Sequence, residues 1–275
     1  LALLKPVIRR CDLLITNGSL PILRIDGDLF PAIETPLSPE HTRKLIYSLL
    51  NETQQAQFER SRELDFSLAV TGQLRFRANI YHQKGTIAGA FRLIPRSVPD
   101  LRSLGLPPVV VEMTMRPNGL ILVTGPTGSG KSTTMASMLD LINRTRRCHI
   151  VTVEDPIEFV HEKRMSIIDQ REVYADTLSF ANALKYVLRQ DPDVILVGEM
   201  RDIETISAAL TAAETGHLVI ATLHTNDAVQ SIDRIVDVFP PHHHTQIRVQ
   251  LAFALIGVIS QQLLPRADGR GRILA

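Results

Sequence analysis

The sequence contains no tryptophan, two cysteines, and no apolar run long enough to cross a membrane. Cys11 and Cys148 are far apart and form no C-x-x-C pair. This spacing argues against a structural zinc site or a disulfide framework and favours reduced thiols in a cytoplasmic protein. No apolar stretch reaches the roughly 18 residues that a membrane-spanning helix needs. The apolar start, residues 1–6, is too short for a signal peptide.

Charge of one sign is also missing. Thirty basic and 29 acidic residues give a net charge of +1. A chain-wide basic field that would attract nucleic acid is therefore absent, although a local patch stays open. With 275 residues, 44% of them hydrophobic, the chain can build one large or two ordinary domains.

A complete GxxxxGK[ST] motif occupies residues 125–132. It follows the apolar run 119–124 and precedes the helix-like stretch 133–142. A buried strand would deliver this loop to a helix N-terminus, where unpaired N–H groups and the positive dipole end face an anion. In such loops the lysine, here Lys131, reaches the β- and γ-phosphates, and the hydroxyl at Ser132 ligates Mg²⁺. The residues predicted to bind the nucleotide are Gly125, Pro126, Thr127, Gly128, Ser129, Gly130, Lys131, Ser132 and Thr133.

The pattern of the chain changes along its length. Residues 1–97 mix short strands and helices in an α+β pattern, and the proline-rich segment 98–108 is predicted to be an interdomain linker. From 109 to 275, strands and helices alternate, which predicts an α/β domain with a mostly parallel sheet. Because the chain starts without Met and stops at Ala275, we expect a fragment truncated at its C-terminal end.

The elements expected in the second half are four strands and five helices. The strands are 120–124, 149–153, 193–197 and 218–223, and the helices are 131–144, 179–190, 202–215, 227–237 and 243–262. In the first half we expect a hairpin over 22–30, a helix that starts with Ser38 and Pro39, and strands over 64–70, 74–81 and 85–93.

Acidic residues follow two of the expected strands, where ligands bind in open α/β sheets. Glu154, Asp155 and Glu158 come after the first, and Glu199 ends the second. Carboxylates here can hold a metal ion and orient water. Their alternative roles are a solvated loop for the first group and a helix-capping loop for the second. Glu199 follows Gly198, whereas the acid of a Walker B strand more commonly follows an apolar residue.

Histidines and arginines add further candidates. His217 and His224 flank the strand 218–223, and His224 could donate to a γ-phosphate or be a structural residue. The run 242–244 is interpreted as a polar helix entry, since no cysteine or carboxylate partner lies nearby for a metal. Arg77 and Arg92, like Arg75, suit bidentate phosphate contacts, but taken alone they are better explained as solvated or paired strand residues.

The ordered set of motifs resembles the secretion and type IV pilus ATPase superfamily, and within it the pilus retraction ATPases (PilT family). The matching stretches are 24–28, 75–79, 91–95, 125–132, 153–159, 198–202 and 216–225. The resemblance covers almost the whole chain. It implies a RecA-like P-loop ATPase domain preceded by a small PAS-like N-terminal domain. It also implies a homohexameric ring at the cytoplasmic face of the inner membrane, where the ring works with the pilus platform protein and the pilin machinery.

The same resemblance assigns roles to individual residues. It implies ATP and Mg²⁺ as cofactors, Glu158 as general base, and Glu199, with Ser132, at the metal. Glu154 and His217 would belong to the nucleotide-binding set, with His217 and His224 on the γ-phosphate side. Arg77 and Arg92 would be arginine fingers from the N-terminal domain, and nucleotide would bind between the two domains.

Retraction is favoured over extension because the part before the ATPase domain is short and a four-cysteine zinc insert is lacking. Met200, where related ATPases often have Ile, points weakly the same way. Two departures stand out. The stretch 11–14 lacks the family's histidine, and the retraction-associated Ala-Ile-Arg-Asn-Leu-Ile-Arg motif is not in this chain. Coupling to a pilus is therefore supported by no residue of this sequence.

Two other functions stay open. A related secretion or DNA-translocating ring ATPase is disfavoured for DNA by the near-zero net charge. A nucleotide-switched regulatory subunit with little turnover would be expected to lose an acidic site, yet Glu154, Glu158 and Glu199 are all present.

Overall fold

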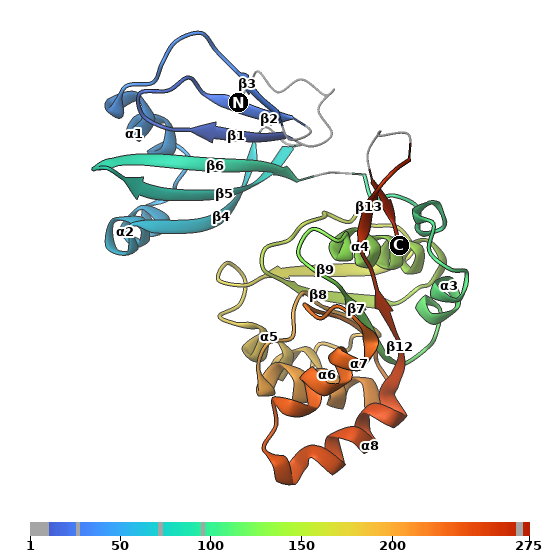
Figure 1. Cartoon of the computed structure of the whole chain (residues 1–275). Coiled ribbons are helices and arrows are strands. Elements are labelled where there is room, and N and C mark those ends of the chain that lie inside the picture. Colours follow the sequence, from blue (N-terminus) through green and yellow to red (C-terminus); the bar gives the residue numbers. More distant parts are fainter. Residues whose placement is uncertain (1–10, 26–27, 71–73, 95–96, 268–271) are drawn as a thin grey trace. The chain divides into compact units, whose positions relative to one another are not determined.

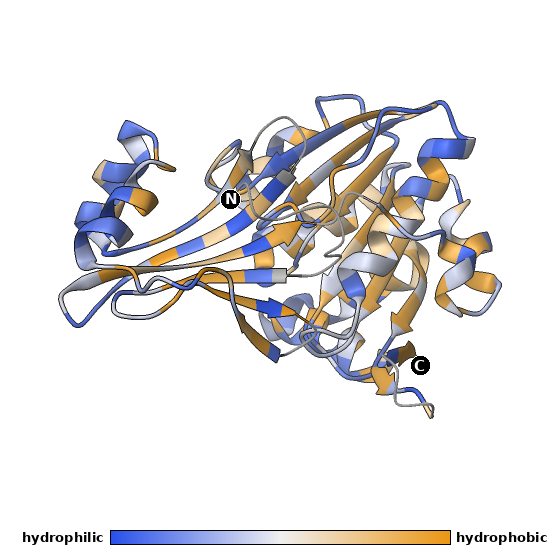
Figure 2. Ribbon diagram, turned by 90° about the horizontal axis from the view of Figure 1, so that it is seen from above, coloured by the Kyte–Doolittle hydropathy of each residue, from blue (hydrophilic) through white to orange (hydrophobic). Residues whose placement is uncertain are grey.

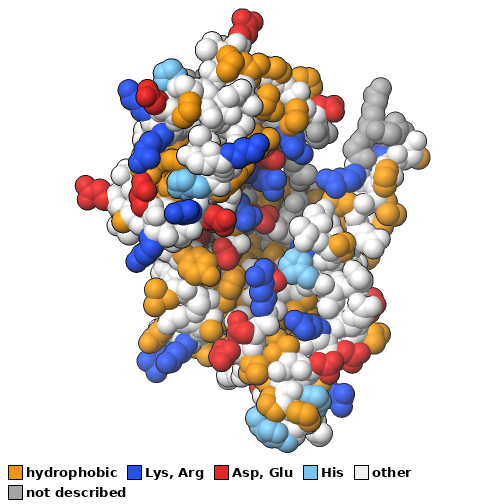
Figure 3. All heavy atoms as spheres, turned by 60° about the vertical axis from the view of Figure 1, so that its left-hand side comes forward, with side chains coloured by type: hydrophobic (Ala, Val, Ile, Leu, Met, Phe, Trp, Pro, Cys, Tyr) orange, Lys and Arg blue, Asp and Glu red, His pale blue; other side chains and the backbone are white. Residues whose placement is uncertain are grey.

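The structure, a computed structural model, divides into two units, Leu1–Arg96 and Ser97–Ala275 (Figure 1). It describes residues 11–25, 28–70, 74–94, 97–267 and 272–275. None of the helices in these ranges has the length and apolar character needed to span a bilayer. Basic and acidic side chains are interspersed on the face shown in Figure 3, as a net charge of +1 suggests.

The first unit is one antiparallel sheet with two helices. Its strands are β1 (Cys11–Ile15), β2 (Ile22–Ile25), β3 (Asp28–Pro31), β4 (Glu63–Val70), β5 (Leu74–Gln83) and β6 (Thr86–Ile94), and its helices are α1 (Pro39–Tyr47) and α2 (Glu52–Ser61). The strand order is β3-β2-β1-β6-β5-β4. In the expected hairpin, β2 pairs with β3, and its turn residues 26–27 lie outside the described ranges.

Alternation along β5 builds the core of this unit. Phe76, Ala78 and Ile80 are buried on one face, as a strand with one face against a core requires. Ile46 of α1 and Phe58 of α2 are fully buried in the same cluster. The predicted start of α1 is confirmed, because the hydroxyl of Ser38 accepts a hydrogen bond from the N–H of His41, and Pro39 holds the first position.

The second unit contains a six-stranded sheet, and every neighbouring pair in it is parallel. Its strands are β7 (Gly119–Thr124), β8 (His149–Glu154), β9 (Ile167–Glu172), β10 (Val194–Val197), β11 (Leu218–Leu223) and β12 (Leu255–Ser260), in the order β12-β7-β11-β10-β8-β9. A small hairpin, β13 (Leu263–Pro265) and β14 (Arg272–Leu274), follows. The predicted α/β domain with a parallel sheet is confirmed.

Helices cover both faces of this sheet. They are α3 (Val109–Thr114), α4 (Lys131–Thr145), α5 (Phe180–Val187), α6 (Ile203–Glu214), α7 (Ala228–Asp237) and α8 (His244–Ala254), with short 3-10 turns η1 (Leu101–Leu104) and η2 (Pro241–His243). One hydrophobic cluster joins the sheet to α5, α6, α7 and α8, and another joins its other face to η1, α3 and α4. Successive residues of β7 alternate between the two clusters. In Figure 2, hydrophobic ribbon segments accordingly run between the helices of this unit.

Several parts of the second unit differ from what the sequence suggested. The expected helix 243–262 ends at Ala254, and residues 255–260 form strand β12 beside β7. Residues 251–259 contain no polar side chain, and periodicity alone cannot assign such a run to a helix or to a strand. Strand β9 was not predicted. The expected linker 98–108 is grouped with this unit, where Leu101 is buried in the cluster beside α4.

Leu122, which is fully buried in β7, provides a test of this packing. We expect Leu122→Ala to lower the free energy of unfolding by about 3 kcal/mol, since the removed atoms leave a cavity between sheet and helices. Urea unfolding followed by far-UV circular dichroism measures the change. The control is Val229→Ala on α7, where the side chain is 71% exposed and the expected change is within about 0.5 kcal/mol. Equal effects of the two substitutions would contradict the assigned core.

Candidate functional site

The motif 125–132 forms a loop between the end of β7 at Thr124 and the start of α4 at Lys131. Gly130 is the N-cap of α4, has a φ of 95°, and provides no side-chain cap. Ser132 and Thr133, half-buried, lie in the first helical turn. The first N–H groups of a helix lack partners within the helix, so this end of α4 is suited to an anion.

Gly125 is required at the start of the loop by close packing. Its φ is 139°, and a Cβ there would lie 2.2 Å from the carbonyl oxygen of Gln261 and 2.7 Å from Oγ of Ser129. Any other residue would clash with backbone that cannot move away easily. The tip of the loop, Pro126, Thr127 and Gly128, is exposed.

Lys131 turns its ammonium group back over the loop. Nζ donates to the carbonyl oxygens of Gly125 at 2.8 Å and Pro126 at 3.1 Å, and lies 3.4 Å from Nδ1 of His224. Desolvation by burial lowers the pKa of Lys131, and the negative charges of Glu199 and Glu158 act in the opposite direction. Glu199 and Glu158 are therefore close enough to share one electrostatic environment with the loop lysine.

Glu199 follows β10 with Gly198 between them, and it is held by the side chains of Arg201 and His224. Its Oε1 accepts from Nε of Arg201 at 2.6 Å and lies 3.3 Å from Nε2 of His224. Burial acts to raise the pKa of Glu199, but Arg201 and His224 outweigh it, so the net pKa is lowered and the carboxylate stays ionised. His224 thus bridges Lys131 and Glu199 and joins three of the predicted residues in one cluster.

The glycine before this acid has a packing reason. A Cβ on Gly198 would lie 3.1 Å from the carbonyl oxygen of Val153 and 3.2 Å from Cα of Glu154. Gly198 therefore allows the end of β10 to approach the end of β8 closely. This contact explains the departure from the more common Walker B ending.

Glu154, at the end of β8, is the most strongly perturbed acid of the site. Burial raises its pKa to about 7, although hydrogen bonds from Thr152 and Gln170 to Oε1, at 2.6 and 3.3 Å, favour the ionised form. Its Oε2 also accepts from the N–H of Glu158 at 3.5 Å. Glu154 therefore supports the loop that carries Glu158, whose own side chain is exposed.

Two residues of β9 that the sequence analysis did not single out hold that loop. Nε2 of Gln170 donates to the carbonyl oxygen of Phe159 at 2.8 Å, and its Oε1 accepts from the N–H of His161 at 2.9 Å. The buried carboxylate of Glu172 accepts from the N–H of Ile157 at 3.1 Å. The role of these two residues could not be predicted from the sequence, because strand β9 was not predicted and pairs with β8 only in the folded sheet.

His217 is not brought to this site. It precedes β11, and its Nδ1 lies 2.9 Å from the carbonyl oxygen of Ala212 and 3.3 Å from Oγ1 of Thr215. Because β11 runs parallel to β7 and has six residues, His217 and His224 lie at opposite edges of the sheet, separated by about 20 Å at roughly 3.3 Å per residue. The expectation that His217 lines the γ-phosphate side in this chain is corrected accordingly.

Arg77 and Arg92 belong to the first unit. They are register partners on β5 and β6. Nε and Nη2 of Arg92 donate to the two carboxylate oxygens of Asp12 at 2.9 and 3.1 Å, which is a bidentate ion pair. Nη2 of Arg75 donates to Oγ of Ser67 at 3.0 Å. The paired-residue alternative therefore describes Arg92 and Arg75 in this structure, and the finger role of Arg77 and Arg92 stays a prediction.

The donor set of the site fits a magnesium ion. Mg²⁺ prefers oxygen ligands and keeps several waters, with one or two protein groups and substrate phosphates completing its shell. Ser132 offers a hydroxyl at the start of α4, and Glu199 offers an ionised carboxylate. Within the described ranges, no three His, Cys, Asp or Glu residues are grouped so that they could hold a metal by themselves.

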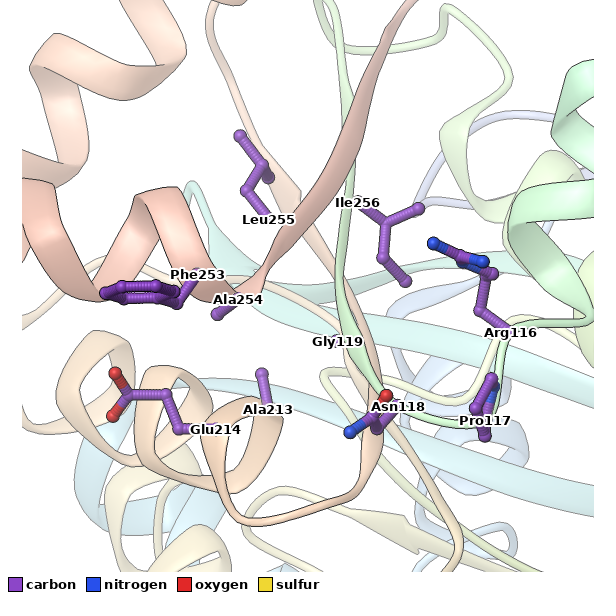
Figure 4. A pocket seen from close by; sticks show the side chains of 10 residues that line it. All are labelled: Arg116, Pro117, Asn118, Gly119, Ala213, Glu214, Phe253, Ala254, Leu255 and Ile256. Carbon is purple, nitrogen blue, oxygen red and sulfur yellow. The ribbon is translucent and has the colours of Figure 1, made fainter.

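A hollow of about 640 Å³ lies at the other edge of the sheet (Figure 4). It is lined by Gly119 at the start of β7, by Glu214 at the end of α6 and by Phe253 on α8, among others. Gly119 and the phosphate loop lie at opposite ends of β7, so this hollow is separate from the site around Lys131.

Comparisons with known proteins agree with this geometry. A family model described as "Type II/IV secretion system protein" matches residues 85–272. The chain is 50% identical over 264 residues to the type IV pilus retraction ATPase PilT of Pseudomonas aeruginosa. The matched region covers 96% of this chain and 76% of the relative. It is 49% identical over 253 residues to a twitching motility protein of Neisseria gonorrhoeae, with 92% and 68% covered. The crystal structure of the pilus retraction motor PilT with bound ADP matches with a TM-score of 0.93 and 53% identity, and covers 98% of this chain and 78% of that one.

The raised pKa of Glu154 predicts a pH-dependent contribution to stability. The pKa of this carboxyl rises from 4.5 in the unfolded chain to about 7 in the folded protein. Its stabilising contribution is therefore complete at pH values below the unfolded pKa. This contribution is lost as the pH rises through the upper value, with a loss of about 3 kcal/mol at most. Urea unfolding of wild type and Glu154→Gln between pH 4.5 and 8 tests this. We expect wild type to lose stability relative to the variant as the pH rises; parallel pH profiles would show that Glu154 titrates normally.

Proposed function

The chain belongs to the Type II/IV secretion system protein family, and within it to the PilT family of type IV pilus retraction ATPases, and from this premise we propose that it hydrolyses ATP to drive pilus retraction. The observation that carries the proposal is the cluster at the carboxyl edge of the parallel sheet. There the open end of α4, Lys131, His224 and Glu199 are joined by contacts of 2.8 to 3.4 Å. Such a cluster can hold a nucleoside triphosphate and stabilise negative charge at its γ-phosphate.

In the proposed reaction the loop residues bind the phosphates through backbone N–H groups, and Lys131 exchanges its loop carbonyls for phosphate oxygens. Ser132 and Glu199 would hold Mg²⁺, partly through water, and the bound ion would supply neutralisation of negative charge on the phosphates. Glu158 accepts a proton from the water that attacks the γ-phosphorus, while the bond from the γ-phosphorus to the bridging oxygen breaks and ADP leaves with that oxygen. Its exposed carboxylate lies on a loop that Glu154, Gln170 and Glu172 hold in place.

The two other polar groups have supporting roles. His224 donates to the γ-phosphate side while its second nitrogen remains at Glu199, since one imidazole already lies beside both Lys131 and Glu199. Arg201 keeps Glu199 ionised through its 2.6 Å hydrogen bond. Arg77 and Arg92 act as arginine fingers that stabilise the transition state.

The assembly is proposed to be a homohexameric ring. The second unit is the RecA-like ATPase domain and the first unit is a PAS-like domain, with residues 98–108 as their connection. The ring works at the cytoplasmic face of the inner membrane with the pilus platform protein and the pilin machinery. Family membership supports each of these proposals, and hydrolysis-driven motion within the ring would remove pilin from the pilus base.

Glu158→Gln tests the chemistry. The substitution keeps the size of the side chain but removes its basicity, so we expect MgATP turnover to fall at least about 100-fold, while ADP binding stays unchanged. The matched control is Glu162→Gln in the same segment, where the side chain is 81% exposed and 3.6 Å from Arg164. Phosphate release assays give the rates and light scattering gives the size of the assembly. Wild-type turnover in Glu158→Gln would remove Glu158 from the mechanism, and a monomer that turns over rapidly would refute the ring.

Arg77→Ala tests the finger role. Loss of a transition-state arginine is expected to lower the turnover number about 10³-fold with little change in ADP affinity, because the charge acts only as the γ-phosphate leaves. Arg60→Ala on α2, an exposed arginine of the same unit, is the control and should retain the wild-type rate. Stopped-flow binding of a fluorescent ADP together with the turnover assay separates the two effects. An unchanged rate in Arg77→Ala would leave Arg77 a structural residue of β5.

A further inference from the structure

Gln261 lies at the phosphate loop although no sequence motif pointed to it. It follows β12, whose last residue, Ser260, pairs with Thr124 at the end of β7. The side chain is 3% exposed. Gln261 therefore enters the site from the strand on the side of β7 opposite to β11.

Gln261 is hydrogen-bonded to both ends of the loop. Its backbone N–H donates to the carbonyl oxygen of Thr124 at 3.0 Å, just before the loop. Its side-chain Nε2 donates to the carbonyl oxygen of Ser129 at 2.8 Å, just before α4. Its own carbonyl oxygen occupies the space beside Gly125 that a Cβ would fill. One residue thus fixes the entry and the exit of a loop that otherwise has an exposed tip.

The bond to Ser129 has a directional consequence. In a trans peptide the C=O and the N–H point to opposite sides of the chain. The carbonyl of Ser129 belongs to the same peptide as the N–H of Gly130, the N-cap of α4. Holding that carbonyl against Gln261 turns the N–H of Gly130 away from β12, toward the side where an anion meets the end of α4.

The buried side-chain amide of Gln261 is not explained by its contribution to the stability of the fold. Among the described residues, Oε1 of Gln261 and Oγ of Ser129 are buried without a hydrogen-bond partner. A buried polar oxygen without a partner costs roughly 1–3 kcal/mol, a penalty that an apolar side chain of similar length would avoid. Only a donor, however, can satisfy the carbonyl of Ser129 and hold its direction.

We propose that Gln261 is a positioning residue for phosphate binding: it orients the Ser129–Gly130 peptide so that the Gly130 N–H faces the nucleotide phosphates. The inference rests on the proposed nucleotide binding and deepens it. It assigns part of the affinity for a nucleoside diphosphate to the end of β12, outside the phosphate-binding motif itself.

The test compares Gln261→Met with Gln262→Met in the full chain. Methionine keeps the length of the side chain and removes the donor; Gln262 is exposed, and its backbone pairs with Ala275. We expect Gln261→Met to bind MgADP, measured with a fluorescent ADP, at least about tenfold more weakly, and Gln262→Met to bind like wild type. The KM for MgATP should rise by a similar factor with kcat changed less than about threefold, which is the pattern of lost uniform binding. A merely structural role would lower the active fraction, and therefore kcat, without moving the KM.

Equal MgADP affinity in wild type and Gln261→Met would overturn the inference and leave the proposed function intact. If the wild type binds MgADP but does not hydrolyse MgATP, and Gln261→Met binds MgADP more weakly, the proposed function is refuted and the inference is supported. A wild type that binds no MgADP would refute both. If Gln261→Met does not fold, a crystal structure of wild type with MgADP decides. The inference requires Nε2 of Gln261 on the carbonyl of Ser129 and the Gly130 N–H on a phosphate oxygen, and a Gly130 N–H that points elsewhere would overturn it.

Discussion

Parallel pairing of the strands in the second unit is the constraint on which the site depends. All six strands run in the same direction, so their carboxyl ends meet at one edge. Five adjacent strands each deliver one component there: the phosphate loop after β7, Glu154 at the end of β8, Glu199 after β10, His224 after β11 and Gln261 after β12. Reversing any one strand would carry its component to the opposite edge, as the position of His217 illustrates.

Charges at this edge balance within the protein. Lys131 is nearly buried, and its ammonium is stabilised by two loop carbonyls and by the field of Glu199 and Glu158. Glu199 in turn is kept ionised by Arg201 and His224 against the effect of burial. A buried charge is tolerated when it is paired and hydrogen-bonded, so the cluster keeps ionised groups in place before any phosphate arrives.

Much of the second unit could be predicted from the sequence because its signals are local. The strand, glycine loop and helix around 125–132 are indicated by an apolar run and by the turn residues themselves. The start of α6 is also local, because Asp202 caps it by accepting from the N–H of Thr205 at 2.7 Å. The helix expected over 243–262 was wrong in its second half. There the pairing of β12 with β7 and the contact of Gly257 with Met113 select a strand that periodicity cannot distinguish from a buried helix.

The sequence by itself determined many of the strands and helices of the second unit, that a phosphate loop lies at a helix start, and that acids follow the strands beside it. Tertiary structure alone decided which of these groups meet. Strand order and direction are set by long-range packing, and they join His224 to Lys131 and Glu199, leave His217 at the far edge, and place Gln170 and Gln261 against the two loops. Those contacts connect residues up to 132 positions apart, a distance over which no local pattern in the chain carries information.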